Sequence, residues 1–139
     1  MRSSKTYYLP ENVGFYSTNN SESLAVDLSQ NIREILLETI KKRGRASMAV
    51  SGGSTPVPLF VALSHLDIDW SKVDLTLVDD RWVESDHKDS NELLVKSHLI
   101  KNKAGNVNFV PLKNNALTAK DGQASSEEAL KSFTLPFDI

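Results

Sequence analysis

The chain has 139 residues, of which 40% are hydrophobic and 24% charged, and its 16 basic and 18 acidic side chains leave a formal net charge of −2. These values are ordinary for a globular domain and exclude long disorder or a collagen-like repeat. The near-neutral balance carries no electrostatic signature of nucleic-acid binding. No cysteine is present, which excludes disulfides, thiolate metal sites and a cysteine nucleophile.

The length predicts one domain, residues 1–139, which can bury roughly two thirds of its unfolded surface. The apolar stretches are far too short to span a membrane, and the N-terminus lacks the apolar core of a secretory signal. We therefore expect a cytoplasmic protein with neither a membrane nor a nucleic-acid partner. One feature does not fit a complete domain: the last residues, Leu135–Ile139, resemble the start of a buried strand.

The predicted elements begin with a short strand at 13–16 and a long helix at 21–43. The helix is indicated by apolar side chains that recur every four residues along one face, namely Leu24, Leu28, Ile32, Leu36 and Ile40. Ser and Asn residues before this pattern suit an N-cap, and Gly44 suits the position just past the helix end.

Further strands and helices then alternate. The apolar patterns predict strands at 46–51, 74–78 and 107–110, with helices at 57–66 and 91–100. Residues 113–122 are expected to form a loop. Ser125 and Glu128 match a capping box, which predicts a helix from there to about Phe133.

This alternation predicts an α/β fold: a mostly parallel sheet with helices on both faces, in a Rossmann-like three-layer arrangement. Ligands of such sheets bind beyond the carboxyl ends of the strands. The loops that follow the strands at 46–51 and 74–78 are therefore the places where a functional site is expected.

The first of these loops is Ser51-Gly52-Gly53-Ser54-Thr55. Two glycines allow a positive φ or a close approach of the backbone to a ligand. The helix that follows presents unpaired N–H groups and a positive dipole end, and the hydroxyls add donors, which together suit a phosphate. The segment matches neither the Walker nor the dinucleotide-binding pattern. A tight turn with a serine or threonine N-cap explains the same residues equally well.

The second loop begins with Asp79-Asp80-Arg81-Trp82. Adjacent residues of an extended chain point to opposite faces, so only one of the two aspartates is expected to face a ligand. Arg81 suits a phosphate or carboxylate through its planar guanidinium. The alternative is a structural ion pair at the strand end. Trp82 is expected to pack in the core or against a lid.

The third segment is Asp89-Ser90-Asn91, where Asp89 or Ser90 suits the N-cap of the following helix. The three histidines at 65, 87 and 98 do not show metal-ligand spacing, and we expect them to be structural. No serine-histidine-aspartate set and no nucleophile elbow is present. The residues themselves therefore indicate an α/β domain that binds a sugar phosphate or nucleotide phosphate.

Taken in order, Ser51–Pro56, Val78–Val83 and Asp89–Asn91 resemble the 6-phosphogluconolactonase family, within the group that includes glucosamine-6-phosphate deaminase and ribose-5-phosphate isomerase. The resemblance covers most of the chain from about Phe15. The form Asp-x-Arg-Trp-Val resembles the lactonase branch, since the deaminase branch usually has tyrosine where Arg81 stands. It implies the sugar-phosphate isomerase/deaminase-like fold and hydrolysis of 6-phosphoglucono-δ-lactone in the oxidative pentose phosphate pathway.

The resemblance also implies roles for individual residues. The loop of Ser51, Gly52, Gly53, Ser54 and Thr55 would face the substrate phosphate. Asp79 and Arg81 would line the lactone end as catalytic residues, with Arg81 stabilising the oxyanion, and Asn91 would join the substrate-binding set. The resemblance implies no metal and no organic cofactor. It does not distinguish a monomer from a homodimer.

This sequence departs from the family pattern at three places. Asp80 stands where the family commonly has glutamate, and Glu84 where it often has proline. The third departure is larger, because the family's catalytic histidine lies in a Gly-x-Gly-x-Asp-Gly-His segment that is absent here. The resemblance thus implies an N-terminal portion, truncated at its C-terminal side, with little hydrolysis by residues 1–139 alone. A related deaminase or isomerase and a non-catalytic sugar-phosphate-binding module are the alternatives.

Overall fold

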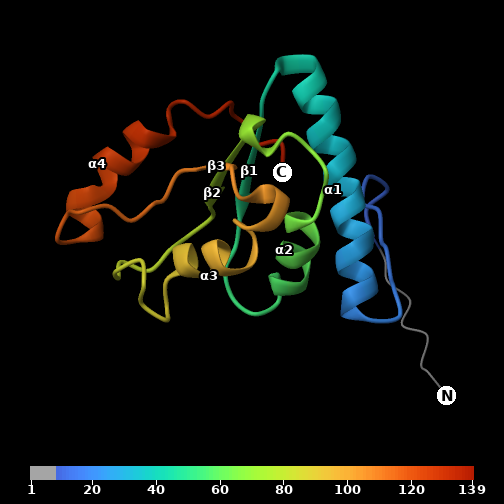
Figure 1. Cartoon of the computed structure of the whole chain (residues 1–139), viewed down its shortest axis with the longest axis horizontal. Coiled ribbons are helices and arrows are strands. Elements are labelled where there is room, and N and C mark those ends of the chain that lie inside the picture. The colour runs from blue at the N-terminus through green and yellow to red at the C-terminus, as the bar shows by residue number, and fades with distance from the viewer. Residues whose placement is uncertain (1–8) are drawn as a thin grey trace.

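The computed structural model describes residues 9–139, and a three-stranded parallel sheet lies at its centre (Figure 1). The strands lie in the order β1 (Ala46–Val50), β2 (Val73–Leu77) and β3 (Asn108–Phe109). Within the described residues the helices are α1 (Ser21–Arg43), α2 (Val57–Ser64), η1 (Trp70–Lys72), α3 (Asn91–His98), η2 (Asn102–Ala104) and α4 (Ala119–Leu130). This arrangement confirms the predicted α/β class with a parallel sheet.

Helix α1 begins and ends where the sequence predicts. The Asn20 side chain accepts a hydrogen bond from the Ser23 N–H at 2.8 Å, which caps the N-terminus. Gly44 has φ of +83° and donates its N–H to the Ile40 carbonyl, as expected for a glycine that ends a helix.

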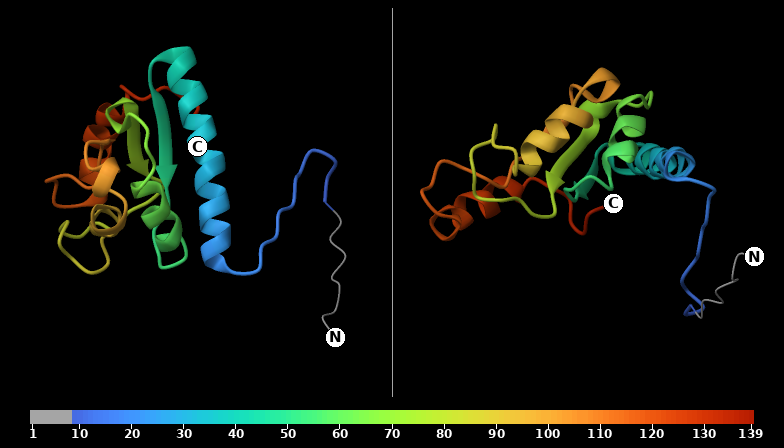
Figure 2. Two further views of the ribbon diagram at one scale, coloured as in Figure 1. Left: turned by 45° about the vertical axis from the view of Figure 1, so that its right-hand side comes forward. Right: turned by 90° about the horizontal axis from the view of Figure 1, so that it is seen from below.

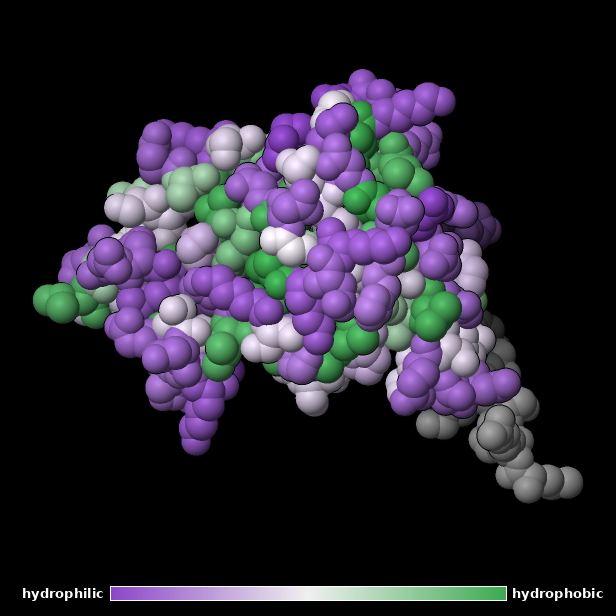
Figure 3. Space-filling view, in the orientation of Figure 1, coloured by the Kyte–Doolittle hydropathy of each residue, from purple (hydrophilic) through white to green (hydrophobic). Residues whose placement is uncertain are grey.

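The apolar face of α1 is only half covered. Ile32 and Leu36 are buried, whereas Leu24 is 45% and Leu28 41% exposed. Figure 3 shows such apolar side chains interrupting the polar surface on the side of the molecule where α1 lies. No helix among residues 9–139 has the length and apolar character needed to cross a membrane.

Three helices form one layer beside the sheet, because α1 packs against α2 and α2 against α3. Both views of Figure 2 place α4 on the far side of the strands from α1. The core lies between the helix layer and the strands. Its largest fully buried side chains are Trp70, Phe60, Leu36, Met48, Leu63, Leu75 and Leu99.

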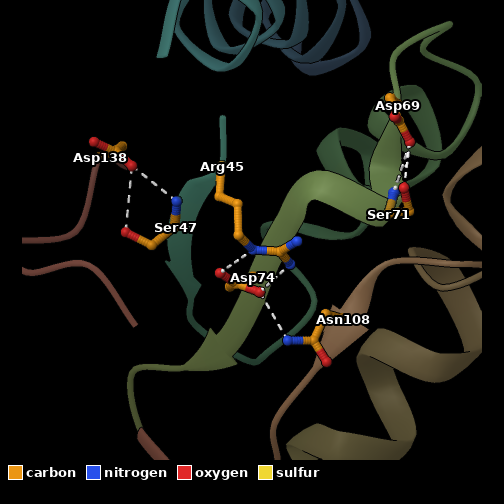
Figure 4. Close-up of polar contacts among 7 residues, drawn as sticks. All are labelled: Arg45, Ser47, Asp69, Ser71, Asp74, Asn108 and Asp138. Atoms are coloured by element: carbon orange, nitrogen blue, oxygen red, sulfur yellow. Dashed lines mark hydrogen bonds and ion pairs between the residues drawn. The ribbon is translucent and has the colours of Figure 1, made fainter. Parts of the chain in front are cut away.

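The C-terminal residues pair with the outer edge of β1. Ile139 donates its N–H to the Ser47 carbonyl and accepts from the Ala49 N–H, which is the pattern of a parallel ladder. The Asp138 carboxylate holds this pairing, because it accepts from the Ser47 N–H at 2.8 Å and pairs with Arg43. Figure 4 shows the contact between Asp138 and Ser47. The strand-like end of the sequence is thus seen in its last two residues.

Two predicted elements are wrong. Residues 13–16 form no strand: the sheet consists of β1, β2 and β3, and Phe15 and Tyr16 are exposed. The last helix begins at Ala119, six residues before the predicted capping box. Its N-cap is Thr118, whose hydroxyl accepts from the Asp121 N–H at 3.1 Å. The first residues of α4 thus lie in the segment 113–122 that was predicted as a loop.

A polar network joins the strands at the amino-terminal end of the sheet (Figure 4). Asp74 of β2 accepts two hydrogen bonds from the Arg45 guanidinium, at 2.6 and 3.1 Å, and one from the Asn108 amide at 2.7 Å. Arg45 immediately precedes β1 and Asn108 opens β3. One buried carboxylate therefore ties all three strands together at the end opposite to the candidate site.

Candidate functional site

The candidate site lies where β1 and β2 end. Val50 pairs with Leu77 across the two strands, and the Val78 N–H donates to the Val50 carbonyl at 2.9 Å. The chain therefore leaves both strands side by side. The two predicted loops, which start at Ser51 and Asp79, are brought together at the carboxyl edge of the sheet, where α/β proteins bind ligands.

The loop Ser51–Thr55 has unused hydrogen-bond donors. Across residues 9–139, no acceptor is found for the backbone N–H groups of residues 52–55 or for the hydroxyls of Ser51, Ser54 and Thr55. Gly53 has φ of +87°, which favours glycine. Helix α2 follows directly, so its positive dipole end adds to the same group of donors. This is the chemistry of an anion site.

The alternative explanation of this loop, a serine or threonine N-cap, is not what the structure has. The N-cap of α2 is Pro56, and it makes no side-chain capping bond. Pro58 lies in the first turn, where the missing N–H costs nothing. The hydroxyl groups are consequently left for a ligand rather than used by the helix.

A cavity of about 350 Å³ adjoins the loop, between the N-terminal part of α1 and the start of α2. Its polar wall is formed by Ser51, Gly52 and Thr55. Its apolar wall is formed by residues of the two helices, which include Leu24, Ala25, Leu28 and Leu59. The loop thus faces a concave surface and not open solvent on every side.

The two adjacent aspartates have different environments, as predicted. One oxygen of Asp80 accepts from the N–H groups of Arg81 and Asn91, both at 2.8 Å, so this side chain fixes the turn and the start of α3. Its other oxygen, Oδ2, is buried without a partner among the described residues. Asp79 is exposed at the strand end. Of the pair, Asp79 is therefore the more exposed carboxylate.

Arg81 is exposed, and its guanidinium makes no ion pair or hydrogen bond within residues 9–139. The alternative of a structural ion pair at the strand end is thus not observed, because Asp80 holds the backbone of Arg81 and not its side chain. An exposed, planar cation without a partner among these residues is suited to a carboxylate or to a developing oxyanion.

Trp82 packs, as predicted, and does not form a stacking platform. Its Nε1–H donates to the Ala116 carbonyl at 3.0 Å, and the Lys113 ammonium lies 4.9 Å from the ring centroid. A β-carbon on Gly122 would lie 2.4 Å from the ring, so this glycine is required for the close packing of α4. Trp82 therefore anchors the loop that carries Arg81 to the segment before α4.

Two of the three histidines lie away from this site. His65 and His98 stand at the C-terminal ends of α2 and α3, which is the opposite end of the sheet. His87 is exposed in the loop that follows β2, and its Nδ1 accepts from the Asp89 N–H at 3.0 Å. Ser90 caps α3 by accepting from the Leu93 N–H at 3.1 Å. The described residues also contain no cluster of three or more histidine or acidic side chains arranged to hold a metal ion.

Comparisons with known proteins agree on one family. The family model described as "Glucosamine-6-phosphate isomerases/6-phosphogluconolactonase" matches residues 19–139. A 6-phosphogluconolactonase of Mesorhizobium japonicum is 43% identical over 116 residues, covering 84% of this chain and 49% of the relative. One of Rhizobium meliloti is 42% identical over 120 residues, covering 86% of this chain and 52% of the relative.

A solved structure shares the fold. The crystal structure of a 6-phosphogluconolactonase from Shewanella baltica superposes with a TM-score of 0.88 at 45% identity, covering 91% of this chain and 55% of that one. The chain thus spans about half the length of the relatives it matches.

Proposed function

The chain belongs to the family of glucosamine-6-phosphate isomerases and 6-phosphogluconolactonases, and we propose that its site serves the hydrolysis of 6-phosphoglucono-δ-lactone to 6-phosphogluconate. The observation that carries this proposal is the loop of free donors beside a free arginine. The backbone N–H groups of residues 52–55 suit a phosphate, and Arg81 lies on the neighbouring loop. A phosphorylated sugar acid has charge at both ends, whereas its lactone is charged only on the phosphate and gains negative charge on the carbonyl oxygen during hydrolysis.

The proposed roles follow from this arrangement. The loop Ser51–Thr55 binds the phosphate through backbone N–H and hydroxyl groups, with Asn91 beside it. Asp79 and Arg81 face the lactone end. When water attacks the lactone carbonyl, negative charge develops on its oxygen, and the Arg81 guanidinium stabilises that charge. In the product, the same guanidinium pairs with the carboxylate.

The first test is ligand selectivity, measured by isothermal titration calorimetry. We expect 6-phosphogluconate to bind at least about tenfold more tightly than gluconate, because a phosphate adds several charge-assisted hydrogen bonds. Thr55→Val is expected to weaken the binding of 6-phosphogluconate and to leave the binding of gluconate unchanged. Thr134→Val is the matched control, since that exposed hydroxyl has no partner among residues 9–139 and lies outside the site.

The same preparation distinguishes the branches of the family. Because residues 1–139 contain no Gly-x-Gly-x-Asp-Gly-His segment, they are expected to bind the product without accelerating acid release from freshly generated lactone. Turnover of glucosamine 6-phosphate with release of ammonia would overturn the lactonase assignment. Equal affinity for gluconate and 6-phosphogluconate would overturn the phosphate site.

A further inference from the structure

Asn91, the first residue of α3, contacts both loops of the site. Its amide Nδ2 donates to the Asp79 carbonyl at 3.1 Å and lies 3.4 Å from the Asp79 carboxylate oxygen Oδ1. Its other side-chain atom, Oδ1, lies against Gly52, where a β-carbon would come within 2.0 Å of it. One carboxamide therefore fills the space between the phosphate-type loop and the end of β2.

This contact explains why position 52 is glycine. In the described chain, positive φ values among glycines occur only at Gly44 and Gly53, so Gly52 needs no special backbone freedom. What Gly52 provides is space, and Asn91 occupies that space rather than a ligand. A single side chain consequently fills the space between the loop and Asp79.

Helix capping does not account for the Asn91 side chain. The Ser90 hydroxyl already caps α3 through the Leu93 N–H. The backbone N–H of Asn91 is satisfied by Asp80. The carboxamide therefore takes no part in capping α3, and its two polar atoms are directed to the two loops of the site.

We propose that Asn91 is a positioning residue that fixes the distance between the Ser51–Thr55 anion loop and Asp79, and thereby selects for the length of the phosphorylated acid that spans them. This inference rests on the proposed function for its ligand. On this proposal a six-carbon acid places its phosphate at the Ser51–Thr55 loop and its carboxylate at Arg81, which follows Asp79, whereas a four-carbon acid occupies the Ser51–Thr55 loop alone. Loss of the Asn91 side chain lowers this selectivity for length.

The test is a double-mutant cycle with Asn91→Ala, Gly52→Ala and the double variant. The probes are 6-phosphogluconate and the four-carbon acid 4-phosphoerythronate, titrated by calorimetry. Asn91→Ala is expected to weaken the binding of 6-phosphogluconate roughly three- to tenfold, the range of one lost hydrogen bond. The affinity for 4-phosphoerythronate is expected to stay nearly unchanged. Gly52→Ala is expected to weaken the binding of 6-phosphogluconate at least about tenfold, because the β-carbon of the new alanine collides with Asn91.

The double variant decides the matter. Removing the Asn91 side chain vacates the place of the new β-carbon, so the double variant should bind no more weakly than Asn91→Ala alone. Additive losses, or an equal loss for both acids, would overturn the positioning role. Asn106→Ala is the matched control, because Asn106 is exposed and precedes β3 at the opposite end of the sheet.

A ligand-free measurement keeps the inference separate from the proposed function. In ¹H–¹⁵N spectra, Asn91→Ala is expected to shift or broaden the amide signals of Gly52, Gly53 and Asp79, while signals of the strands and those of the Asn106→Ala control stay in place. If the wild-type chain binds neither acid, the proposed function fails and these spectra still decide. Unchanged signals at all three residues would refute the contact.

Discussion

Replacing Arg81 by methionine is expected to weaken the binding of 6-phosphogluconate roughly 10- to 100-fold, since a hydrogen bond to a charged group contributes about 1.5–3 kcal/mol. The guanidinium is exposed and has no partner within residues 9–139, so its loss leaves no buried group unsatisfied. Methionine keeps the length and the apolar stem of the side chain. The change in affinity therefore measures the contribution of the positive charge of Arg81.

Glucose 6-phosphate provides the discriminating measurement for this variant. It carries the phosphate but no carboxylate, so Arg81→Met is expected to change its Kd less than about threefold, well under the effect of a charged hydrogen bond. Arg33→Met, on α1, is the control for removing a positive charge. Equal losses for both ligands would mean that Arg81 binds the phosphate, and no loss for either would remove it from the site.

Replacing Asp74 by alanine is expected to lower the free energy of unfolding by roughly 2–3 kcal/mol, because three hydrogen bonds to a buried carboxylate are lost. Burial raises the pKa of Asp74, but the hydrogen bonds from Arg45 and Asn108 outweigh it and hold that pKa below the ordinary value of 3.8. Equilibrium denaturation with urea at neutral pH gives the size of the effect.

The pH dependence of this contribution has a definite sign. A carboxyl whose folded-state pKa is lowered stabilises the fold fully above the ordinary value of 3.8, and it loses that contribution as the pH falls through the folded-state pKa. The difference in stability between the wild type and Asp74→Asn should therefore narrow as the pH falls below that value. A difference that is constant from neutral to acidic pH would contradict the network.

The elements that were predicted correctly are those whose sequence signals lie within the element or directly beside it. Helix α1 is delimited by Asn20 and Gly44, and both caps act within one turn of the helix. The loop Ser51–Thr55 was placed correctly because the apolar runs on either side of it are clear. Such features depend on neighbours in the chain, which a single sequence displays.

The errors and omissions depend on contacts between distant residues. Gly122 was included in the predicted loop at 113–122, yet it lies inside α4, where the Trp82 ring occupies the place of a β-carbon. Likewise, nothing in the sequence indicates that Asn91 would lie against Gly52. The capping role of Asp80 on α3 spans eleven positions and has no local pattern. Tertiary packing decides these points, and propensity does not.

Phosphate binding by the loop Ser51–Thr55 is tested most directly by a ¹H–¹⁵N titration with 6-phosphogluconate. We expect saturable shifts of the amide signals of Gly52, Gly53, Ser54 and Thr55, whereas gluconate at the same concentrations should leave these signals in place. Shifts centred on another part of the chain, or identical shifts with gluconate, would contradict it.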